Sequence, residues 1–346
     1  MKFWKKAANL VLRFVLALVA SGIILYLSGY SPLKAYKAMF WGAISNWDGI
    51  ALSLVQATPL IFTGLAVAFA NNCGIFNIGG EGQLYLGAIA AGIIGAFLPS
   101  MPHFLHLFLA LAGGAVVGGL WASIAAWLKV KANANEVIIT IMLNNISILL
   151  CSYLVNYVFK APGPVPQTPE VQPSASLSRL GTGTQLSTAL FLGVLLVFAV
   201  WFILYRTKVG YEIRAVGANP RAAAAAGINV PGMMTLALFL SGSLAGLGGA
   251  SQVLGLHGRF IQGFSPGYGF DGIAVAILGG NSPIGVLFSA LLFGLMRAGG
   301  MVLDRTTKIP VDFVLIIQAA IILFVAAPDI FKSLKGGVKG ARSVAK

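Results

Sequence analysis

The sequence of 346 residues is strongly apolar: 58% of it is hydrophobic, only 9% is charged, and its mean hydropathy is +0.88. Soluble domains carry about 25% charged residues, so this composition excludes a water-soluble fold. A net charge of +14 would suit nucleic acid. However, Lys and Arg gather at the chain ends and between apolar runs, which indicates contact with membrane surfaces and not with nucleic acid.

Apolar runs long enough to cross a bilayer follow one another along the chain. A helix needs about 20 apolar residues to span the hydrocarbon core. The sequence predicts ten such segments, at residues 8–29, 50–70, 75–98, 104–128, 136–159, 186–205, 232–254, 266–281, 284–303 and 309–327. The eighth is short and Gly-rich, so it either dips into the membrane or crosses it. We therefore expect an all-α polytopic membrane protein, residues 1–346 forming one transmembrane domain with some discontinuous or re-entrant helices.

The basic residues predict the orientation of these spans. With a cytoplasmic N-terminus, ten crossings place fourteen of the 23 Lys and Arg residues on the inner side. This excess follows the positive-inside rule. Both termini are then cytoplasmic, including a basic tail at residues 332–346.

Two connecting segments are long enough to have roles of their own. Residues 160–185 contain five prolines, which disfavour a helix, and are expected to form an ordered external loop. Residues 206–231 are expected on the cytoplasmic side. There Asn219 as N-cap, Pro220 at the first helical position, five alanines and Gly227 as terminator predict a short helix.

Two of the nine acidic residues, Glu81 and Asp271, lie within apolar surroundings. A charge near the bilayer centre costs about 2.5–3.5 kcal/mol on insertion scales, so such residues face a cavity or a partner. Each carboxylate is therefore a candidate for lining a transport pathway. The alternative is that each caps a broken helix, because both follow Gly-rich stretches.

Neutral amides accompany these carboxylates in the apolar segments. The candidates for contact with a polar, uncharged substrate are Asn77, Gln83, Asn144 and Asn145. Hydrogen bonding between helices is the alternative role for such residues. No G-x-x-x-x-G-K-[ST] motif occurs, so the chain has no usual loop for ATP phosphates, and no metal site is predicted.

Four blocks resemble the permease subunits of ATP-binding cassette (ABC) importers for simple sugars, nucleosides and branched-chain amino acids. The blocks are GIFNIGGEGQLYLGA at 74–88, NEVIITIMLNNI at 135–146, GYEIRAVGANPRAAAAAGI at 210–228 and GFDGIAVAILGGNSPIGVLFSALLFG at 269–294. They occur in the family's order and the similarity covers nearly the whole chain. The Pro-rich PGPVPQTPE at 162–170 is similar to the nucleoside branch.

This resemblance implies a set of partners and a place in the bacterial plasma (inner) membrane. Residues 210–228 would be the coupling helix that contacts an ABC ATPase subunit, which would bind the ATP and Mg²⁺. A second, homologous permease would complete the pore, and an extracytoplasmic lipoprotein would deliver the substrate. The coupling candidates are Glu212, Arg214, Gly217, Asn219, Pro220, Ala223, Ala224 and Gly227.

The resemblance leaves alternatives open. The substrate of such a permease would be a nucleoside, a simple sugar or a branched-chain amino acid. The Gly-rich stretches at 76–92 and 264–280 also echo one another, as repeats do in ion-coupled secondary transporters. A passive channel is the third class, although it would have no use for a helix at 220–227.

Overall fold

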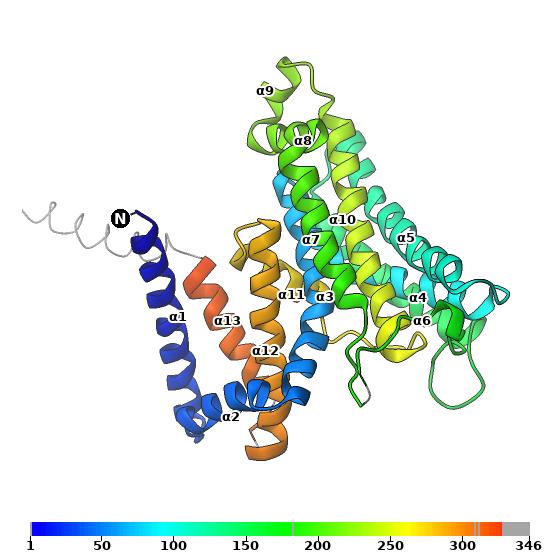
Figure 1. Cartoon of the computed structure of the whole chain (residues 1–346). Helices are drawn as coiled ribbons and strands as arrows, with labels where there is room; N and C mark the ends of the chain where they lie inside the picture. The colour runs from blue at the N-terminus through cyan, green and yellow to red at the C-terminus, as the bar shows by residue number, and fades with distance from the viewer. Residues whose placement is uncertain (1, 182, 308, 311, 327–346) are drawn as a thin grey trace, which may run out of the picture. The chain divides into compact units, whose positions relative to one another are not determined.

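The computed structural model describes residues 2–181, 183–307, 309–310 and 312–326 (Figure 1). Two compact units are present: one comprises residues 50–295, and the other comprises the chain up to Gly49 and from Met296 onward. The chain passes between them within α3 and again within α12. Among the described residues the regular structure is helical, with two isolated β-bridges.

The helices follow the apolar pattern of the sequence. In chain order they are α1 (Lys2–Leu27), α2 (Pro32–Ile44), α3 (Trp47–Asn72), α4 (Gly80–Phe97), α5 (His103–Ala132), α6 (Glu136–Tyr153), α7 (Ala189–Arg206), α8 (Lys208–Ala218), α9 (Pro220–Ala225), α10 (Val230–Gln252), α11 (Tyr268–Leu278), α12 (Pro283–Thr307) and α13 (Asp312–Ala326). Single π-helical turns, η1 (Leu154–Val158) and η3 (Val253–His257), extend α6 and α10. A 3₁₀ turn, η2 (Pro173–Ala175), lies in the Pro-rich segment.

The helical membrane class predicted from the sequence is confirmed. Six described helices are long and apolar enough to cross a membrane, namely α3, α5, α6 with η1, α7, α10 with η3, and α12. Each of the ten predicted segments coincides with a helix, but the number of crossings stays a prediction. The eighth segment forms α11, whose 11 residues extend about 16 Å. That helix reaches across about half of the hydrocarbon core and cannot cross alone.

Glycine backbones form the centre of the larger unit, where α4, α5 and α10 pack together. A Cβ at Gly246 would collide with the backbone of Gly114, and a Cβ at Gly87 would collide with Gly246. Gly118 and Gly242 make a similar backbone contact. Lipid removes the hydrophobic drive for helices to associate, so close approach and dispersion stabilise this packing.

The Pro-rich segment is ordered against the ends of α4 and α10. Backbone N–H groups of Gln172 and Leu177 donate to the carbonyls of Gly95 (2.9 Å) and Leu254 (2.8 Å). Glu170 forms an ion pair with Arg259. The Pro-rich segment leads into the start of α7, and α8 follows the end of α7. The Pro-rich segment and α8 therefore lie at opposite ends of α7 (Figure 1). The external location of the Pro-rich segment stays a prediction.

The smaller unit contains α1, α2, α13 and the later part of α12. The Tyr36 hydroxyl on α2 donates to the Leu18 carbonyl on α1 (2.6 Å). A Cβ at Gly299 of α12 would collide with the Met39 carbonyl of α2, so close backbone contact also joins these helices.

Replacement of Gly246 by Ala is expected to destabilise the larger unit. The new methyl group meets backbone atoms of α5, which cannot rotate away, and overpacking of this kind costs about 1–3 kcal/mol. Gly193→Ala is the matched control, because its Cβ would lie at an ordinary 3.4 Å or more from Phe62 and Ile61. A thermal unfolding curve in detergent should show a lower midpoint for Gly246→Ala alone. Equal midpoints for the two variants would contradict the close packing.

Candidate functional site

A break in the helical chain places polar residues inside the larger unit. Between α3 and α4, residues 73–79 form an irregular turn. Asn77 is fully buried there, and its amide oxygen accepts hydrogen bonds from the N–H of Gly79 (2.9 Å) and from Nε2 of Gln83 (3.2 Å). Its amide nitrogen donates to Oε1 of Gln83 (3.0 Å) and to Oγ of Ser241 on α10 (2.9 Å). The two amides thus hold the turn in one conformation.

Asn144 joins this turn to α6. Its Oδ1 accepts from the N–H of Gly82 (2.7 Å) and its Nδ2 donates to the carbonyl of Ile78 (2.8 Å). Asn145 lies on a different face of α6: its side chain is exposed and donates to the Ile141 carbonyl (3.2 Å). The structure therefore brings Asn77, Gln83 and Asn144 together and separates Asn145 from them.

Glu81 connects the N-termini of two helices. It lies in the first turn of α4, is 3% exposed, and its Oε2 accepts a 2.5 Å hydrogen bond from the N–H of Gly269 in the first turn of α11. Gly269 allows this approach, because a Cβ there would collide with the backbone of Glu81. The first N–H groups of a helix lack partners within the helix and carry partial positive charge. The carboxylate of Glu81 thus offsets the partial positive charge at the N-termini of both α4 and α11.

Asp271 is half-buried in the first turn of α11. A carboxylate at this position interacts favourably with the dipole of its own helix. The contacts of Glu81 and the position of Asp271 fit helix capping in this conformation. Their role toward a substrate stays a prediction.

The far end of α11 is tied to the end of α3. Nδ2 of Asn71 donates to Oδ1 of Asn281 (3.0 Å), and Nδ2 of Asn72 donates to the Asn281 carbonyl (2.9 Å). Asn281 has a left-handed backbone with φ of 54°, a conformation that Asn tolerates better than most residues. Both ends of α11 are therefore fixed by polar contacts to α3 and α4.

The predicted short helix after Asn219 is present as α9. Oδ1 of Asn219 accepts from the N–H groups of Arg221 (3.0 Å) and Ala222 (3.1 Å), and Pro220 occupies the first helical turn. Gly227 follows with φ of 82°, a left-handed conformation that favours glycine. The helix has six residues, and its role in coupling stays a prediction.

The preceding helix α8 is seated on the end of α3. A Cβ at Gly217 would collide with the Asn72 carbonyl. The guanidinium of Arg214 lies 5.1 Å from the ring centroid of Tyr205, and Glu212 forms an i,i+4 pair with Lys208 (3.7 Å). Gly217 and Arg214 thus fix α8 against α3 and α7, whereas the pair of Glu212 lies within α8 itself.

The two alanines chosen for contact with a partner differ in exposure. Ala223 is 4% exposed and is buried within this chain, whereas Ala224 is exposed. Ala224 is consequently the residue of the pair that an external protein can contact.

Sequence reasoning missed the partners of the predicted residues. Ser241, Thr140 and Gly269 each complete a hydrogen bond in the network, with Thr140 Oγ1 accepting from the N–H of Ile78 (3.3 Å). Ser241 and Thr140 are small polar residues in apolar runs, and that pattern was the available signal. Gly269 donates through its backbone N–H, so the Gly-rich stretch around it indicated close packing but not this hydrogen bond.

The six helices of bilayer length fit a multi-pass α-helical membrane protein, and helices that begin inside the protein are common in transporters. Residues 49–326 match the family described as the branched-chain amino acid transport system / permease component. The chain belongs to this family of permeases, and the resemblance found in the sequence is confirmed. Its members are transport subunits and not enzymes.

Three relatives resemble the chain over nearly its full length. The guanosine ABC transporter permease protein NupP of Bacillus subtilis is 36% identical, over 95% of each chain. The glucose ABC transporter permease protein TsgB13 of Haloferax volcanii is 35% identical, over 97% of this chain and 91% of the relative. The nucleoside ABC transporter permease protein NupB of Lactococcus lactis is 33% identical, over 96% of this chain and 94% of the relative.

Variants of Glu81 distinguish capping from contact with the substrate. If Glu81 caps α11, Glu81→Ala should lower the unfolding midpoint, since losing a buried hydrogen bond to a charged group costs about 1.5–3 kcal/mol. Glu81→Gln keeps an acceptor oxygen and should lose less. Asp271→Asn makes the same kind of change at a half-buried carboxylate, and its unfolding midpoint is compared with that of Glu81→Gln. If both Glu81 variants keep the wild-type midpoint and lose only uptake, the capping role is excluded.

Proposed function

We propose that this chain is the permease subunit of an ABC importer that takes up nucleosides by alternating access. The observation that carries the proposal is its similarity to the guanosine and nucleoside permeases over more than nine tenths of each chain. The site agrees with a neutral, polar cargo, because amides surround the break between α3 and α4.

The proposed assembly has three kinds of subunit contact. An ABC ATPase, which holds the ATP and Mg²⁺, contacts α8 and α9, and a second, homologous permease completes the pathway. A substrate-binding lipoprotein docks on the side of residues 160–185. The chain forms one permease domain with ten membrane segments and cytoplasmic termini in the plasma membrane, and the basic tail at 332–346 lies outside the described residues.

The contacts of α11 supply a route by which ATPase motion reaches the centre of the permease. α8 contacts Asn72 through Gly217, Asn72 bonds to Asn281 at one end of α11, and Gly269 at the other end bonds to Glu81. A displacement of α8 would therefore be passed through α11 to the start of α4. Asn77, Gln83 and Asn144 are buried and hydrogen-bonded, so in this proposal they meet the substrate only after such a displacement.

A simple sugar is the second candidate substrate, because the glucose permease TsgB13 is as similar to this chain as the nucleoside permeases are. Branched-chain amino acids appear in the family's description and form a third option. An ion-coupled transporter would use the same broken helices without an ATPase.

Uptake by the complete transporter decides among these substrates. We expect vesicles that contain the chain with its native partners to accumulate labelled guanosine or uridine when ATP is supplied to the ATPase side. Excess unlabelled nucleoside should abolish accumulation, whereas glucose and leucine should not. Accumulation of glucose alone would assign the chain to the sugar branch, and uptake that needs an ion gradient but no ATP would refute the importer class.

Ala224→Glu tests the coupling role of α9. If the exposed Ala224 is buried against the ATPase, a glutamate there costs roughly 1–3 kcal/mol in unpaired polar burial. We expect normal membrane levels, with ATPase co-purification and uptake both lost. Ala224→Ser is the conservative control, and Ala223→Glu should instead impair folding because that side chain is buried in the chain itself. Normal uptake by Ala224→Glu would refute the role.

A further inference from the structure

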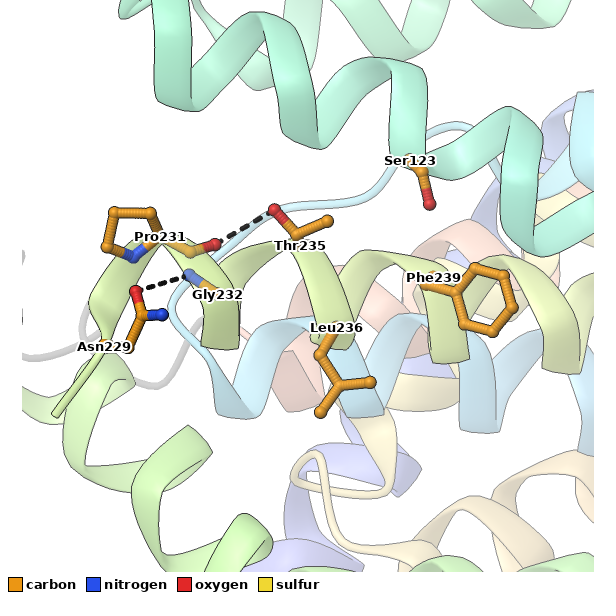
Figure 2. Close-up of a pocket in the computed structure, with 7 residues that line it drawn as sticks. All are labelled: Ser123, Asn229, Pro231, Gly232, Thr235, Leu236 and Phe239. Carbon is orange, nitrogen blue, oxygen red and sulfur yellow. Dashed lines mark hydrogen bonds between the residues drawn. The ribbon is translucent and has the colours of Figure 1, made fainter.

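A groove lies between α5 and the start of α10, the helix that follows α9 in the chain (Figure 2). Its volume is about 510 Å³, and its walls include Ser123 on α5 and Thr235, Leu236 and Phe239 on α10. Figure 2 shows the two helices farther apart toward Asn229, at the start of α10. The network around Glu81 and Asn77 does not contribute to its lining.

The groove follows from the glycine packing of the same two helices. Gly118 and Gly242 bring the backbones of α5 and α10 into contact. Helices that meet through glycines cross at an angle, so they separate on either side of the contact. Ser123 and Thr235 lie beyond this contact, toward the end of α5 and the start of α10. Their small side chains do not fill the space that opens between the helices.

The polar side chains of the groove are satisfied within their own helices. The Ser123 hydroxyl donates to the Gly119 carbonyl (2.9 Å), and the Thr235 hydroxyl donates to the Pro231 carbonyl (3.0 Å). Oδ1 of Asn229 accepts from the N–H of Gly232 (3.1 Å), as Figure 2 shows. The hydroxyl protons are thus directed at backbone carbonyls. The groove walls thus consist of the apolar side chains Leu236 and Phe239 and of hydroxyls that are already hydrogen-bonded. Walls of this kind favour a hydrocarbon chain over a polar ligand.

The end of α5 fixes the depth of the groove in the membrane. Trp127 is 60% exposed, as is typical of aromatic residues at the membrane–water interface. Lys131 is exposed in the last turn of α5 and lies about 12 Å along the helix from Ser123. The groove therefore starts near the headgroup level and descends toward the acyl chains.

The charge at this end favours an anionic headgroup. Lys131 is exposed there, while Lys129 is paired with Glu136 (2.8 Å). A basic residue beside a groove between membrane helices attracts anionic lipids. We propose that the groove binds an anionic phospholipid, with an acyl chain against Leu236 and Phe239 and the phosphate near Lys131.

Native mass spectrometry of the full chain with its partners tests this site, using 1-palmitoyl-2-oleoyl phosphatidylglycerol and the matching phosphatidylcholine as probes. The wild type should retain the glycerol lipid in preference to the choline lipid. Ser123→Phe fills the groove and should lower retention at least tenfold. Ile124→Phe is the matched control, because Ile124 is exposed on the same helix outside the groove lining. Thr235→Phe repeats the test from the other wall.

The headgroup is tested separately. Lys131→Gln should remove the preference for the anionic lipid, and soluble glycerol phosphate should not displace the bound lipid. Retention unchanged in both Ser123→Phe and Thr235→Phe would overturn the proposal. If the wild type shows no lipid preference and these variants lose the second permease, the lipid proposal would be wrong. The groove would then be a contact site for that permease. Lipid retention and nucleoside uptake are measured separately. A failure of the lipid proposal can therefore be told apart from a failure of the proposed import function.

Discussion

The hydrogen bond from the N–H of Gly269 to the carboxylate of Glu81 is the contact on which the interior of the larger unit depends. It joins the starts of α4 and α11, two helices that begin inside the protein. The free N–H groups at such starts cost free energy in an apolar environment unless they find acceptors. A charged acceptor also offsets the partial positive charge of both helix ends. A buried carboxylate and two interrupted helices thus stabilise one another.

The surrounding structure holds this contact in place on every side. Asn77 and Asn144 fix the turn that leads into α4, and Asn281 fixes the far end of α11. Glycines let α10 approach α4 and α5 closely enough for Ser241 to reach Asn77. Because Glu81 bonds directly to Gly269, a movement of the start of α11 relative to α4 would change this contact.

The fold class was predictable from the sequence because local signals dominate it. Apolar length located the long helices, Asn219 and Pro220 marked the start of α9, and Gly227 marked its end. The partners in the site were not predictable, because Glu81 and Gly269 are separated by 188 residues. The outward face of Asn145 and the inward face of Ala223 depend on which helices pack against them, and spacing alone does not determine that.

Amide hydrogen exchange at the start of α11 tests the central contact most directly. In the wild-type transporter the N–H of Gly269 is buried and bonded to a carboxylate, so a peptide that covers residues 266–272 should exchange slowly at that position. In Glu81→Ala the acceptor is absent, and exchange there should rise at least tenfold while the middle of α10 keeps its protection. The account predicts this local loss. Equal protection at Gly269 in the wild type and the variant would show that Glu81 does not hold the two helices together.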